Sequence, residues 1–233
     1  MLDVADRITA VSPAPELSVV AATAAIALVV AWPRSRWLQM INVLGTLTHE
    51  FGHAAAAVLS GGGVQHIQLT GSKSGHTRHV PSGRFAHALT AFAGYCFPPL
   101  LGLGAAQLLA DGYAAWVLTG GFALCLLVLF AARGTRTVIT VLLIGVLFAV
   151  VVLFAWSWLV VALAYLVAWL LIATGFEGVL MDVLVPRMRS RAMKRDDADT
   201  LAELTRVPAF VWGLGWLVLA SWCTWQGAIR LWP

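Results

Sequence analysis

The chain has 233 residues, of which 60% are hydrophobic and only 11% are charged, and its formal net charge is +4. A water-soluble globular domain carries roughly 25% charged residues, so this composition excludes an ordinary soluble domain. We expect one integral membrane domain over residues 1–233, built from α-helices that cross the bilayer several times. The basic residues cluster in short loops between apolar segments, which is typical of topology signals, and we expect no nucleic-acid partner.

Apolar segments of helix length recur along the chain and predict an all-α polytopic fold with about six to seven transmembrane helices. The acidic tail 1–16 lacks the basic region of a cleavable signal peptide, so we expect the first apolar segment to remain as a span. The predicted spans are 17–32, 37–59, 85–109, 113–132, two within 137–176 that turn near Trp156, and 207–232. Small residues in the third span predict a ridge for close helix contact, namely Gly94, Pro98, Gly102 and Ala106.

Two polar segments interrupt this pattern. Residues 64–84 alternate apolar and polar side chains on both sides of a Gly-rich turn, which predicts a short β-hairpin. The glycines at 61–63 end the helix before it. We expect the hairpin to be either a connector at the membrane surface or an edge that pairs with an extended substrate. The second segment, a polar loop over 186–206, is rich in Arg and Asp.

The most informative feature is the motif His49-Glu50-Phe51-Gly52-His53, which lies inside an apolar segment. Residues four apart share one face of a helix, so His49 and His53 can place two imidazole nitrogens on one metal ion. Glu50 follows the first histidine, where it can act as a general base on a water molecule. Three ionisable side chains in an apolar helix are costly in lipid, which favours a metal site over a role in helix packing.

A catalytic zinc site needs a third protein ligand, and the spacing does not choose one. Acidic residues at the end of a long apolar span can instead cap it at the interface, and aspartates before a helix can instead cap that helix. Histidines outside the motif are more often surface or packing residues. The candidates are Glu177, Asp182, Asp196, Asp197, Asp199, His66, His76, His79 and His87.

Further stretches accompany the motif. A Gly-rich break and short strands follow it, Ala93-Gly94-Tyr95 lies in the third span with its Pro and Gly residues, and residues 196–202 lead into residues 205–212. With these features the chain resembles the site-2 protease family of membrane-embedded zinc metallopeptidases, and looks most like small bacterial members without accessory domains. The C-terminal stretch is similar to a Ser-Asp-Ala stretch of that subgroup. The Leu-Asp-Gly motif that carries the third ligand in the wider family is absent.

The resemblance implies an intramembrane zinc metalloendopeptidase that hydrolyses peptide bonds of membrane-associated protein substrates. It implies a multi-pass protein of a bacterial cell membrane, with the lipid bilayer and a membrane-protein substrate as its partners. It implies Zn²⁺ as cofactor and these site residues: Glu50 as the catalytic base, and His49, His53 and Asp197 as metal ligands. Asp199 and Asp182 remain alternatives for the third ligand. The alternative function is that of a catalytically idle family member that binds metal or a membrane partner.

Overall fold

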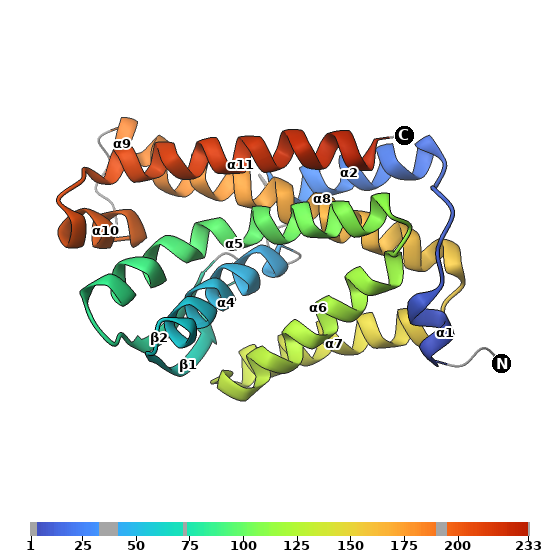
Figure 1. Cartoon of the computed structure of the whole chain (residues 1–233), viewed down its shortest axis with the longest axis horizontal. Helices are drawn as coiled ribbons and strands as arrows, with labels where there is room; N and C mark the ends of the chain where they lie inside the picture. Colours follow the sequence, from blue (N-terminus) through green and yellow to red (C-terminus); the bar gives the residue numbers. More distant parts are fainter. Residues whose placement is uncertain (1–3, 33–41, 72–73, 190–194, 233) are drawn as a thin grey trace.

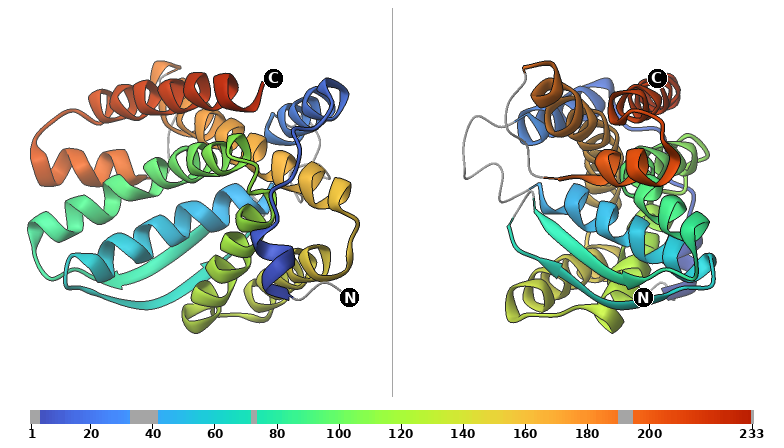
Figure 2. Two further views of the ribbon diagram at one scale, coloured as in Figure 1. Left: turned by 45° about the vertical axis from the view of Figure 1, so that its right-hand side comes forward. Right: turned by 90° about the vertical axis from the view of Figure 1, so that its left-hand side faces the viewer.

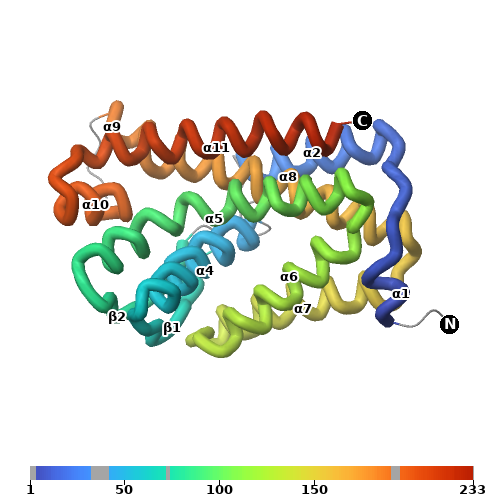
Figure 3. The backbone as a smooth tube through the Cα atoms, in the orientation of Figure 1, coloured from blue at the N-terminus to red at the C-terminus, as the bar shows by residue number. Residues whose placement is uncertain are grey.

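The computed structural model describes residues 4–32, 42–71, 74–189 and 195–232 (Figures 1 and 3). Helices form nearly all of its regular structure, and two strands form one small sheet. The elements in chain order are α1 (Val4–Thr9), α2 (Leu17–Ala31), α4 (Val43–Leu59), β1 (Gly63–Leu69), β2 (Gly75–Val80), α5 (Arg84–Ala110), α6 (Ala114–Ala131), α7 (Thr135–Phe154), α8 (Ser157–Gly178), η1 (Val179–Leu184), α9 (Val185–Met188), α10 (Asp197–Thr205) and α11 (Ala209–Leu231).

Helix α5 lies at the centre of the fold. It contacts α4 on one side and α8 and α11 on the other, while α2 packs on α8 and α6 pairs with α7 (Figures 1 and 2). The short helix α10 also packs on α5, near the end at which α5 begins. This arrangement brings the first and last thirds of the chain together around one helix.

The helices are long and apolar enough to confirm an all-α polytopic membrane protein. Among the described residues, four helices qualify as spans by length and composition: α5, α6, α7 and the continuous helix Ser157–Met188. Helices α10 and α11 qualify only together, bent by 120°, which gives up to five spans. The predicted six to seven spans also include α2 and α4, whose described parts have 15 and 17 residues, whereas a typical span has about 20. Residues 37–41 of the predicted second span lie outside the described residues.

The hairpin predicted over residues 64–84 is confirmed. Strands β1 and β2 pair antiparallel, with Ile67 opposite Thr77. Ile67 and Leu69 are buried among side chains of α4, α6 and α7, which accounts for the alternation in the sequence. The N–H of Arg133, after α6, donates a hydrogen bond to the Ile67 carbonyl at 2.8 Å. The hairpin is therefore anchored to α4, which precedes it in the chain, and to α6 and α7, which follow it.

Small residues let α5 approach its neighbours closely. A Cβ atom added at Gly102 would lie 2.7 Å from Cγ1 of Ile172 on α8, and one added at Gly175 would lie 2.6 Å from Cδ of Pro99 on α5. Neither distance is compatible with a real side chain, so the α5–α8 contact requires glycine on both helices. The predicted small-residue ridge is confirmed at Gly102.

The helix that begins with α8 extends beyond the predicted span, through the π-helical turn η1 and through α9. Glu177, which is buried, and Asp182, which is exposed, both line one cavity in the fold. The predicted polar loop 186–206 includes α9 and α10, and the predicted tail 1–16 includes α1. Helix α10 begins at Asp197, where the sequence pattern predicted a helix.

Candidate metal centre

Helix α4 presents both histidines of the motif to α5. The two Nε2 atoms of His49 and His53 lie 3.1 Å apart, and the rings meet edge to face with their centroids 4.7 Å apart. His53 is buried and His49 is partly exposed. This is the geometry expected of histidines one helical turn apart whose nitrogens converge on one point.

Gly94 on α5 makes this convergence possible. A Cβ atom at this position would lie 2.5 Å from Cε1 and 2.6 Å from Nε2 of His53, and 2.8 Å from Cε1 of His49. The backbone of α5 therefore covers both rings directly, and no side chain larger than hydrogen fits between them.

A hydrogen bond fixes the orientation of the His53 ring. Its Nδ1 lies 2.8 Å from the carbonyl oxygen of Thr90, which can only accept, so Nδ1 carries the proton and donates it. In a neutral imidazole this leaves Nε2 with a free lone pair, directed toward His49. Metal-binding histidines commonly have such a carbonyl partner on the other ring nitrogen.

Asp197, the first residue of α10, completes a group of three potential ligands. Its Oδ2 lies 3.3 Å from Nε2 of His49 and 3.4 Å from Nε2 of His53. Ligand atoms around a tetrahedral zinc ion at bond lengths of about 2.0–2.1 Å lie roughly 3.3 Å from one another. The three observed separations of 3.1, 3.3 and 3.4 Å fit a metal ion of that size.

The other candidate ligands lie elsewhere in the described part of the chain. Asp196 and Asp199 bond to one another's backbone and to Arg187. The four remaining histidines form two edge-to-face pairs, His66 with His76 and His79 with His87. Burial lowers the pKa of His79, so this ring is neutral at pH 7. The one group of three converging ligand atoms found among the described residues is His49, His53 and Asp197.

Glu50 is buried beside the histidines and is held by the hairpin. The hydroxyl of Thr77 on β2 lies 2.7 Å from Oε2 of Glu50, to which it donates, and 3.0 Å from the Glu50 carbonyl oxygen. Gly75 lies on the other side, where an added Cβ atom would be 2.8 Å from Oε1. Thr77 was not predicted as a site residue, although the alternation of the hairpin places it on one face with Gly75 and His79.

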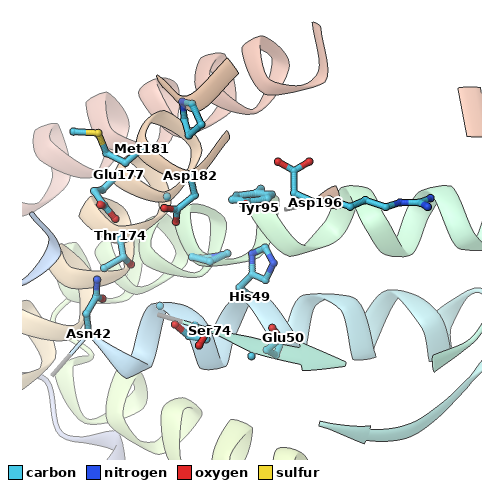
Figure 4. A pocket seen from close by; sticks show the side chains of 18 residues that line it. Asn42, His49, Glu50, Ser74, Tyr95, Thr174, Glu177, Met181, Asp182 and Asp196 are labelled. Atoms are coloured by element: carbon cyan, nitrogen blue, oxygen red, sulfur yellow. The ribbon is translucent and has the colours of Figure 1, made fainter. Parts of the chain in front are cut away.

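A cavity of about 530 Å³ adjoins the metal centre (Figure 4). His49 and Glu50 lie on one side of it, and Glu177 and Asp182 lie across it on the helix formed by α8 and η1. This volume falls within the range of small-molecule pockets, roughly 300–1,000 Å³. Glu50 thus borders a cavity large enough for small molecules such as water.

Tyr95 forms a wall of the cavity. From the sequence, it was identified only as part of the stretch Ala93-Gly94-Tyr95 that resembles the family. Its ring meets that of His49 edge to face with centroids 4.6 Å apart, and it packs against Trp216 on its other side at 4.8 Å. The indole N–H of Trp216 donates to the Phe92 carbonyl at 3.1 Å, which fixes this stack. His49 is thus supported by packing, whereas His53 is supported by a hydrogen bond.

Membrane-spanning helices around a His–His–Asp group with an adjacent buried glutamate define the class of membrane metallopeptidases. The family model described as Peptidase M50B-like matches residues 21–227, so the chain belongs to the peptidase M50B-like family. This confirms the resemblance to site-2 proteases. The family consists in general of zinc metalloproteases in the lipid bilayer. No curated protein and no solved structure matches the chain.

Proposed function

We propose that this protein is an intramembrane zinc metalloendopeptidase that hydrolyses peptide bonds of membrane-associated proteins. The observation that carries the proposal is the set of three ligand-atom separations, 3.1, 3.3 and 3.4 Å, beside a buried glutamate that faces a cavity. Family membership supports the same class of activity.

In this proposal His49, His53 and Asp197 hold Zn²⁺. Two neutral imidazoles and one carboxylate are a donor set that suits this ion. When bound, zinc supplies a Lewis acid that makes a coordinated water more acidic and polarises a carbonyl oxygen. The Thr90 carbonyl keeps the metal-facing nitrogen of His53 unprotonated.

Glu50 is the general base of the proposed reaction. Its carboxylate lines the cavity next to His49, where it can take a proton from water and later give it to the leaving amine. Thr77 holds Oε2 through its hydroxyl, which orients the other oxygen, Oε1, toward Gly75. An extended peptide that pairs with the start of β2 would therefore pass beside the base.

The third ligand can be tested by measuring zinc stoichiometry and affinity in purified protein. Replacing Asp197 with Asn should lower the affinity for zinc by about 100-fold or more, because one of three ligands becomes neutral and less basic. Replacing Asp182 with Asn, across the cavity, should leave zinc affinity unchanged. Competition with a chromophoric chelator measures both values.

The same preparations test the activity with labelled casein in detergent micelles. We expect the zinc-loaded protein to cleave it and a chelator to stop the cleavage. A zinc-loaded protein that leaves casein and single-span membrane proteins intact would favour the catalytically idle alternative. Loss of zinc from Asp182→Asn but not from Asp197→Asn would contradict the ligand assignment.

Replacing Thr77 with Val should lower the rate of casein cleavage about 10- to 100-fold. A hydrogen bond to a charged group contributes about 1.5–3 kcal/mol, and here it orients the proposed base. Zinc affinity should not change, and Thr77→Ser, which keeps the hydroxyl, should restore most of the rate. Equal rates for Thr77→Val and wild-type protein would show that Glu50 needs no such partner.

A further inference from the structure

The first turn of α10 holds three carboxylates, which point in different directions. Oδ1 of Asp196 accepts a hydrogen bond from the Asp199 N–H at 3.1 Å, and Oδ2 of Asp199 accepts one from the Asp196 N–H at 3.1 Å. These two residues form a complete capping box. Of the three, Asp197 is the one whose carboxylate meets the histidines.

Arg187, on α9, binds both capping carboxylates at once. Its Nη1 donates to Oδ2 of Asp196 at 2.7 Å and to the Val183 carbonyl at 2.8 Å. Its Nη2 donates to Oδ1 of Asp196 at 2.7 Å and to Oδ1 of Asp199 at 2.8 Å. Each Nη atom carries two hydrogens, so all four are used. The arginine side chain is 12% exposed, which shields these bonds from water.

This clasp, formed by Arg187 with Asp196 and Asp199, joins two helices of different length. Arg187 lies on the long helix that begins with α8, whereas α10 is a helix of nine residues that meets α11 at a 120° bend. The bond from Arg187 to Val183 ties the guanidinium to the long helix itself. The clasp therefore ties the beginning of α10, where Asp197 lies, to the long helix.

Other contacts hold the rest of α10. Ala198 and Leu201 are buried against η1, α5 and α11, and near the end of α10 Arg84 donates two hydrogen bonds to the Leu204 carbonyl, at 2.6 and 2.9 Å. These contacts hold the helix in the fold, and Ala198 lies next to Asp197 in its first turn. The capping box and Arg187 add directional hydrogen bonds to this packing of the first turn.

We propose that Arg187 is a positioning residue for the metal centre: by binding Asp196 and Asp199 it directs Asp197 to the ion and withdraws the two neighbouring carboxylates from it. This inference rests on the proposed function, in which Asp197 is a zinc ligand. A lysine cannot replace this arrangement, because an ammonium group is a point charge without the planar fork that reaches two carboxylates.

The test is zinc affinity, measured by chelator competition, together with the visible absorption spectrum of the cobalt-substituted protein. We expect Arg187→Met to lower zinc affinity about 10- to 100-fold, the usual effect of losing a group that orients a ligand, and to alter the cobalt spectrum. Arg187→Lys should give a smaller loss. Arg230→Met is the matched control, because Arg230 binds Gln107 and Gln226 on α5 and α11 and should leave both readouts unchanged.

Asp199→Asn is the second test variant, for use if Arg187→Met does not fold. It removes one of the two carboxylates bound by Arg187, at a side chain that is 38% exposed. A partial loss of zinc affinity supports the inference. Wild-type affinity and an unchanged cobalt spectrum in the Arg187 and Asp199 variants would overturn it. A wild-type protein that takes up no zinc would contradict the proposed function itself. Loss of zinc affinity in Asp197→Asn, with wild-type affinity in the Arg187 and Asp199 variants, would contradict only the role of Arg187.

Discussion

Replacing Glu50 with Gln should reduce peptide hydrolysis about 10²- to 10⁴-fold, the usual contribution of a general base. The amide keeps the size of the side chain and can still accept the hydrogen bond from Thr77. It cannot take a proton from water, so the chemical step should slow while zinc stoichiometry stays at the wild-type value. Casein cleavage and metal analysis on one preparation measure both quantities.

Glu203→Gln provides the control for this experiment. Glu203 lies on α10, its side chain is 61% exposed, and it pairs with Arg195 at the surface. The same chemical change at this site should leave cleavage unchanged. Cleavage by Glu50→Gln at the wild-type rate would rule out a general-base role for Glu50, whatever the metal content.

Replacing Gly94 with Ala should lower zinc affinity about 10- to 100-fold, although the substitution adds only one methyl group and no polar atom. The new methyl carbon would lie 2.5 Å from Cε1 of His53 and 2.8 Å from Cε1 of His49. Both rings would have to turn away, or α5 would have to shift, and overpacking of this kind usually costs 1–3 kcal/mol. The two nitrogens then no longer converge. Chelator competition measures the affinity, and thermal unfolding measures the stability.

Gly104→Ala is the matched control on the same helix. Nothing lies within 4 Å of a Cβ atom added at Gly104, and alanine favours a helix over glycine by roughly 0.5–1 kcal/mol. This variant should be at least as stable as the wild-type protein and should bind zinc equally well. Equal zinc affinities for Gly94→Ala and Gly104→Ala would contradict the close approach of α5 to the histidines.

Local sequence patterns predicted the parts of the site that belong to one element. The spacing of His49 and His53 corresponds to one helical turn, and the two nitrogens are indeed adjacent. Alternation predicted the hairpin for the same reason, because it reflects a strand with one buried face. Such patterns depend on the geometry of a single helix or strand.

Contacts between elements that are distant in the sequence could not be predicted from those patterns. Three aspartates follow one another at the start of α10, and spacing does not distinguish a cap from a ligand. The choice depends on Arg187, which reaches Asp196 and Asp199 from another helix. Thr77 was missed because its partner, Glu50, lies on a different element. Among the described residues, helix length alone does not decide whether α4, with 17 residues, crosses a bilayer of about 30 Å.

The candidate ligands come from the two halves of the chain, the histidines from α4 and Asp197 from α10. An ion bound to all three would act as a cross-link that closes most of the polypeptide into one loop. Occupancy at 100 times the dissociation constant adds about 2.7 kcal/mol to the free energy of unfolding. Under the proposed function, the catalytic ion thus also stabilises the fold, by joining the helix that carries the histidines to the short helix beside the C-terminal span.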